Sequence, residues 1–171
     1  MRVGSNGTGD SVAVVSDIVN SWRSPRSVIA RHLQHRASES FAFSLLVAFL
    51  ILAFVALWPN MSRQSFLYPE VPLAQRMLAA GLALLASIPL WYLVAALSRI
   101  LAQRLGGKGD YLDARLALFT ALLSTAPLML VQGALSGFLG QGLLPYIAGL
   151  VVLGGFLYLW FNMLIEAETR P

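Results

Sequence analysis

The chain has 171 residues, of which 57% are hydrophobic and only 12% are charged, whereas a soluble globular domain carries about a quarter charged residues. Residues 116–165 contain no Asp, Glu, Lys or Arg, and this stretch exceeds the roughly 20 residues needed to cross a bilayer. The composition therefore excludes an ordinary soluble domain. Because the chain has no cysteine, disulfides and thiolate chemistry are excluded as well.

The first forty or so residues are more polar than the rest. Residues 1–11 are rich in Gly and Ser, so we expect a disordered tail. Residues 12–40 carry two apolar stripes at helical spacing, and between them Ser24 suits an N-cap and Pro25 the first position of a helix. With arginines around both stripes, this segment predicts amphipathic interfacial helices on the membrane surface. A small soluble subdomain is the alternative, but few apolar residues are available for one.

Residues 41–168 form the predicted membrane domain, an all-α polytopic integral membrane helical bundle. Trp58-Pro59 is expected to end the first span, with the tryptophan at the interface. Pro89 and Pro127 predict kinks in the second and third spans. A turn with Gly140 and Gly142 separates the third span from the fourth. The four spans are predicted at about 41–58, 75–101, 111–138 and 145–165.

Basic residues are distributed unevenly between the two faces of this bundle, and basic residues beside a span resist translocation. Arg63 and Arg76 alone fall on one face. The other ten of the twelve fall on the opposite face, so we expect both termini in the cytoplasm: Arg2, Arg23, Arg26, Arg31, Arg36, Arg99, Arg104, Lys108, Arg115 and Arg170. We expect seven of these residues either to contact anionic lipid or to act as charges that set the topology. They are Arg23, Arg26, Arg31, Arg36, Arg104, Lys108 and Arg115.

The stretch RLGGKGDYLDARLALF, residues 104–119, resembles at first a glycine-rich phosphate loop. A phosphate loop needs GxxxxGK followed by Ser or Thr after a strand, but here Gly109 follows Lys108 and apolar helices flank the loop. We therefore expect no nucleotide, and a tight turn between antiparallel helices instead. Gly106 or Gly107 would end the first helix, and Asp110 would cap the next, with Asp113 in its first turn.

Two other patterns resemble chemical sites but lack essential groups. His32 and His35 lie three residues apart, but only Glu39 stands nearby to complete a metal site. The stretch GALSG, residues 133–137, resembles the motif of intramembrane serine proteases, but no span supplies a base. We expect no catalytic residue, no metal and no cofactor.

Small residues at four-residue spacing predict close helix packing in the membrane. Gly133 and Gly137 in the third span are expected to face Ala83 and Ser87 in the second. The polar residues of the spans are expected to bond between helices, or alternatively to line a small cavity. These polar residues are Tyr92, Ser124, Thr125, Gln132 and Asn162.

The basic N-terminal segment, the glycine turn at 104–119 and the following mid-span proline resemble the bacterial branch of the YIP family, small polytopic membrane proteins named after Ypt/Rab-interacting proteins. The resemblance is best over about 89–127 and looser over the rest of 12–168. It implies an all-helical membrane domain without known enzymatic activity, and in eukaryotic members it implies vesicle trafficking and binding of prenylated small GTPases. Family members are usually drawn with five spans rather than four, and the acidic Tyr-Gly segment of the eukaryotic members is missing here. GTPase binding is therefore not transferred to this chain.

The function expected from these observations is that of a non-enzymatic scaffold or accessory protein in a bacterial inner membrane. Its expected partners are membrane lipids, anionic on the cytoplasmic face, with either another membrane protein or a second copy of the chain, and neither nucleic acid nor nucleotide. The alternative is a small transporter or channel, or a subunit of a transport complex, built around Gln132. Coupled transport is disfavoured because no span carries an ionisable carboxylate or base in its interior, away from its two ends.

Overall fold

Long apolar helices dominate the structure. A computed structural model describes residues 18–34, 38–140 and 142–169, and at residues 31–34 the description covers the backbone alone. Four helical units are long and apolar enough to cross a membrane, which confirms the predicted all-α polytopic bundle. The tail expected at residues 1–11 lies outside the described residues. The units comprise α3 (Glu39–Leu67), α4 (Leu73–Ala86) joined to α5 (Ile88–Arg104), α6 (Tyr111–Leu139) and α7 (Leu143–Thr169).

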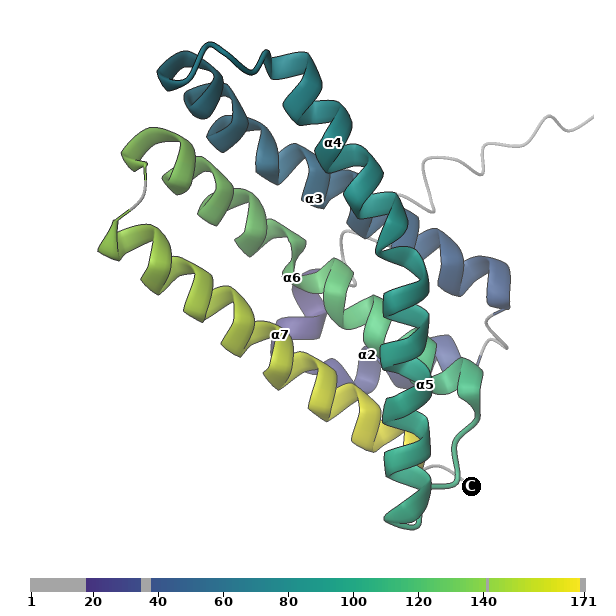
Figure 1. Cartoon of the computed structure of the whole chain (residues 1–171). Helices are drawn as coiled ribbons and strands as arrows, with labels where there is room; N and C mark the ends of the chain where they lie inside the picture. The colour runs from purple at the N-terminus through teal and green to yellow at the C-terminus, as the bar shows by residue number, and fades with distance from the viewer. Residues whose placement is uncertain (1–17, 35–37, 141, 170–171) are drawn as a thin grey trace, which may run out of the picture.

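Helix α6 forms the centre of the bundle, between α3 and α7. The three helices run side by side in Figure 1, while the second span crosses over them. Small residues such as Ala117 and Ala121 allow the neighbouring helices to approach α6, and Phe119 is fully buried among them. The core therefore lies along α6, and α4, in which no residue is buried, lies at the periphery.

The second span is interrupted at Ser87, which ends α4 and precedes α5. Its N–H bonds the carbonyl oxygens of Ala83 and Leu84 at 3.0 and 3.1 Å. Pro89 follows two residues later and has no N–H to donate to the preceding turn. From this point α5 leaves α3, crosses α6 and reaches the C-terminal end of α7 (Figure 1).

The first span differs from the sequence expectation at Pro59. Trp58-Pro59 was expected to end the helix, but α3 continues through Pro59 to Leu67, so that expectation is wrong. A proline inside a helix removes one hydrogen bond, and neighbouring helices can compensate for this in membrane proteins. Here α6 packs directly against Pro59, because a Cβ atom added to Gly137 would lie within 2.8 Å of the proline's carbonyl carbon.

The N-terminal segment packs against the bundle. Residues 18–23 are helical, and α2 (Pro25–Gln34) begins at Pro25 as the sequence predicts. Helix α2 contacts α7 and α6, and its Val28 and Ile29 are fully buried. The indole Nε1 of Trp22 donates to the carbonyl oxygen of Ser124, midway along α6, at 3.1 Å. Much of the segment's apolar surface is thus covered by protein, and its placement on a membrane surface stays a prediction.

Candidate functional site

The glycine turn between α5 and α6 has the local structure expected from its sequence. Gly106 adopts a positive φ of 90° after the end of α5, a conformation that glycine tolerates and other residues rarely adopt. Asp110 is the N-cap of α6, and its N–H donates to Asp113 Oδ2 at 2.8 Å, which forms a capping box. These features confirm a tight helix-to-helix turn.

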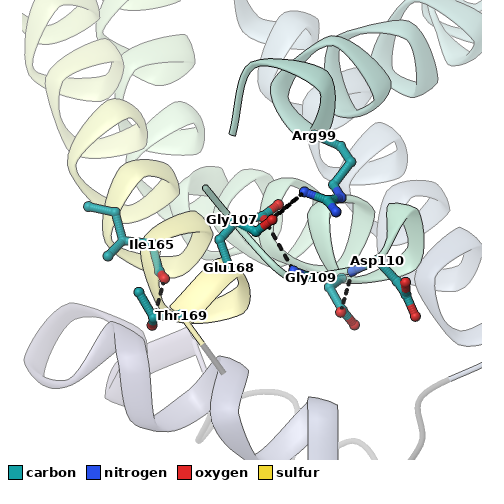
Figure 2. Close-up of polar contacts among 8 residues, drawn as sticks. Arg99, Gly107, Gly109, Asp110, Ile165, Glu168 and Thr169 are labelled. Atoms are coloured by element: carbon teal, nitrogen blue, oxygen red, sulfur yellow. Dashed lines mark hydrogen bonds and ion pairs between the residues drawn. The ribbon is translucent and has the colours of Figure 1, made fainter. Parts of the chain in front are cut away.

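This turn wraps around Glu168, in the last turn of α7. Glu168 Oε2 accepts from Arg99 Nη1 at 2.9 Å and from the Gly109 N–H at 3.1 Å. The backbone is joined as well, since the Lys108 N–H donates to the Glu168 carbonyl oxygen at 3.0 Å. Figure 2 shows the carboxylate between the arginine and the loop. Three distant segments, the end of α5, residues 106–109 and the end of α7, therefore meet at one carboxylate.

The ion pair between Arg99 and Glu168 is buried. The two side chains are 10% and 7% exposed. Withdrawing both charges from water costs several kcal/mol per ion, so that removing only one partner of such a pair typically costs about 3–5 kcal/mol. The second carboxylate oxygen, Glu168 Oε1, is buried without a hydrogen-bond partner. The two charges of the site thus neutralise each other, while Glu168 Oε1 remains an unsatisfied hydrogen-bond acceptor.

Close approach of the loop explains two of its glycines. A Cβ atom on Gly107 would lie 3.1 Å from the carboxyl carbon of Glu168 and closer still to Oε2. A Cβ atom on Gly109 would lie 2.7 Å from the carbonyl oxygen of Ala167. Side chains at either position would therefore push the loop away from α7.

Beside this ion pair, a groove of about 820 Å³ opens between α5 and α7. Its walls are mainly apolar, with Leu97 and Leu101 on one side and Phe161 and Ile165 on the other. Its polar end is formed by the glycine loop with Lys108, and by Glu168 and Thr169. The groove therefore combines an apolar length with a charged end.

Sequence reasoning did not identify Arg99 and Glu168 as a site. Arg99 was counted only among the charges that set topology, and Glu168 only as the limit of the membrane domain. The available signal was the pair of glycines at 107 and 109, which indicates close approach by another segment without saying which one. Glu168 lies 69 positions after Arg99 in the sequence. Periodicity cannot predict a pairing over such a separation.

The residues expected to contact lipid headgroups divide into two groups. Arg23, Arg26, Arg104 and Lys108 are exposed, which leaves their charges available. Arg115 instead pairs with Glu39, and its guanidinium lies over the ring of Tyr92 at 5.1 Å from the centroid. Arg115 therefore joins three helices as well as carrying charge. Arg36 and the side chain of Arg31 lie outside the described residues.

The small residues expected to pack the second span against the third have a different partner. A Cβ atom on Gly133 would lie 2.8 Å from the carbonyl carbon of Ala56, so both Gly133 and Gly137 face α3. Ala83 is exposed and the Ser87 hydroxyl donates to Leu84 within its own helix. The expected pairing is therefore wrong. The interruption at Ser87 and the crossing of α5 direct the second span away from this part of α6.

Several polar residues of the spans bond within their own helices. Gln132 Nε2 donates to Ser136 Oγ at 3.2 Å, and Asn162 Nδ2 to the Tyr158 carbonyl oxygen at 2.8 Å. Thr125 Oγ1 donates to Ala121 O at 2.6 Å. In the part of the chain that the structure describes, no group of three His, Cys, Asp or Glu could hold a metal. The side chain of His32 and all of His35 lie outside that part.

Comparisons with known proteins bear on the whole membrane domain. A family model described as the Yip1 domain matches residues 19–170. Comparisons with curated proteins and with solved structures give no match. The family match covers the N-terminal helices, all four spans and the segment that holds both Arg99 and Glu168.

Proposed function

Because the chain belongs to the Yip1 domain family of membrane proteins, we propose that it is a non-enzymatic scaffold or accessory protein, acting through its shape and through contact with lipid and membrane partners. The observation that carries this proposal is the buried pair between Arg99 and Glu168, which joins the ends of the second and fourth spans. Because this contact fixes the ends of α5 and α7 to each other, the bundle presents the same surface to lipids and to partner proteins.

The same joint disfavours the alternative of a carrier. Alternating access requires helices to rock against one another around a central site, and separating α5 from the end of α7 would leave Glu168 without Arg99. Separation would also break the hydrogen bonds that Glu168 accepts from the Gly109 and Lys108 N–H groups. The polar residues midway through the spans are also engaged locally, as Gln132 is with Ser136.

We place the protein in a bacterial inner membrane with both termini in the cytoplasm. The charge asymmetry supports this orientation, and so do the two arginines on the opposite face. Arg76 donates to Val71 O and Tyr68 O, and to Gln64 Oε1, while Arg63 Nη1 donates to Phe138 O at 3.4 Å. Arg76 thus holds the loop before α4 and Arg63 the end of α6, whereas Arg104 and Lys108 remain exposed to anionic headgroups.

Purification from native membranes in mild detergent tests the proposal. The affinity tag belongs before residue 1, because the C-terminal end of α7 packs into the site. We expect a stoichiometric membrane protein, identified by mass spectrometry, that is absent from a matched purification of an unrelated tagged membrane protein. Ion conductance across a planar bilayer by the purified chain alone would overturn the proposal in favour of a channel.

A further inference from the structure

We propose that the groove between α5 and α7 binds one anionic phospholipid, its acyl chain along the groove and its phosphate beside Lys108. This inference deepens the proposed function, on which it rests, by naming the class of lipid and the site that binds it. Depth, wall chemistry and charge at the closed end each support it.

The groove is about one leaflet deep. Along α5 and its C-cap the lining runs from Val94 to Leu105, a rise of about 16 Å at ~1.5 Å per residue. Half of a hydrocarbon core is about 15 Å. The volume of about 820 Å³ also lies within the roughly 300–1,000 Å³ typical of ligand sites. The groove therefore matches a lipid tail in length and ends where the headgroups begin.

The walls suit an acyl chain. Leu97 and Leu101 on α5 are 55% and 65% exposed, and Phe161 on α7 is 52% exposed. These side chains belong to spans that are surrounded by lipid, where no water is available to fill the space between them. The glycine loop, with Gly106, Gly107 and Lys108, closes one end. A lipid from the surrounding leaflet can enter from the side and place its headgroup against this loop.

Charge at the closed end selects the headgroup. Arg99 and Glu168 neutralise each other, which leaves the exposed ammonium of Lys108 as a single excess positive charge on the groove lining. One phosphate group neutralises the charge of Lys108. The ammonium of a zwitterionic headgroup would bring a second positive charge beside Lys108 and Arg99. The closed end of the groove therefore favours a phospholipid with a net negative charge.

The test uses the purified full-length chain without any partner. The protein is exposed in detergent to equal amounts of phosphatidylglycerol, phosphatidylethanolamine and cardiolipin, and bound lipid is counted by native mass spectrometry. We expect one anionic lipid per chain, phosphatidylglycerol or cardiolipin, in clear preference to phosphatidylethanolamine. Ala102→Phe, which fills the groove, should abolish retention, whereas Ala83→Phe on an exposed part of the same span should leave it unchanged. Lys108→Gln should weaken binding about five-fold, the equivalent of about 1 kcal/mol.

Retention of the anionic lipid by Ala102→Phe, or equal retention of phosphatidylethanolamine by the wild-type chain, would overturn the inference. Covalent dimers formed through Leu101→Cys, the single cysteine of that variant, would show that a second copy occupies the groove and would also overturn it. Because Lys108 is exposed, its variant remains informative if Ala102→Phe does not fold. Absence of bound lipid in this experiment, together with a protein partner in the separate purification from native membranes, would refute this inference and leave the proposed function intact.

Discussion

Arg99 and Glu168 form a buried ion pair with 2.9 Å between Nη1 and Oε2, although they lie 69 positions apart in the sequence. The loop between α5 and α6 completes the contact through the Gly109 N–H. This arrangement fixes the end of the last span to the end of the second, two spans that otherwise diverge around a groove.

The glycine loop should tolerate no side chain at residue 107. In Gly107→Ala the added Cβ would approach the Glu168 carboxylate and lie 3.0 Å from Ala102 O, so we expect a loss of about 1–3 kcal/mol from overpacking. Gly154→Ala is the control, since nothing lies within 4 Å of its added Cβ. Thermal unfolding in one detergent provides the measurement, and equal midpoints for the two variants would refute the steric explanation.

Contact between α3 and α6 should depend on Gly133. Its added Cβ would meet the backbone of Ala56, and a helix backbone cannot move aside as a side chain can. We expect Gly133→Ala to lower the thermal midpoint clearly. Gly81→Ala serves as the comparison, because its Cβ would lie at an ordinary 3.7 Å from Phe54. If Gly81→Ala proved the more damaging substitution, this account of the α3–α6 contact would be wrong.

Trp22 should hold the N-terminal helices against the bundle. Trp22→Phe keeps a ring but removes the indole donor to Ser124 O, at an expected cost of about 1 kcal/mol. Hydrogen exchange of the backbone amides at residues 18–34 should become faster, while Trp58→Phe, at an exposed tryptophan, should leave it unchanged. Unchanged exchange in Trp22→Phe would show that the bond does not anchor the segment.

Membrane orientation can be tested with single cysteines, since the natural chain has none. Phe66, at the end of α3, is 87% exposed, and Lys108 is exposed in the glycine loop. We expect an impermeant maleimide to label Phe66→Cys on intact cells and Lys108→Cys only after permeabilisation. Gly107 is unsuitable because a side chain there would meet Glu168. The reverse labelling pattern would invert the proposed topology.

Local chemistry explains which features could be predicted from the sequence. The four spans follow from long apolar runs, and the turn at Gly106 and the cap at Asp110 follow from residues that act on their immediate neighbours. The start of α2 at Pro25 is of the same kind. The turn, the cap and the start of α2 are each decided within about one helical turn, and each span by the composition of one continuous stretch, so a single sequence contains the required information.

Long-range packing explains the features that could not be predicted. Pro59 is compatible with a continuing helix because α6 packs against it, and Gly133 faces Ala56 because the second span turns away at Ser87. The pairing of Arg99 with Glu168 depends on α5 crossing α6 to reach α7. None of these contacts is visible in periodicity or spacing, because each depends on how whole helices are arranged.

The most direct test of the joint between the second and fourth spans is a double-mutant cycle of Arg99→Met and Glu168→Gln, read as thermal unfolding in one detergent. Each single variant leaves a buried charge without its partner and should cost about 3–5 kcal/mol. The double variant removes both charges, and its glutamine can still accept from the Gly109 N–H. We predict that the double variant unfolds at a higher temperature than either single variant. A loss equal to the sum of the two single losses would contradict the account, because it would show that Arg99 and Glu168 act independently.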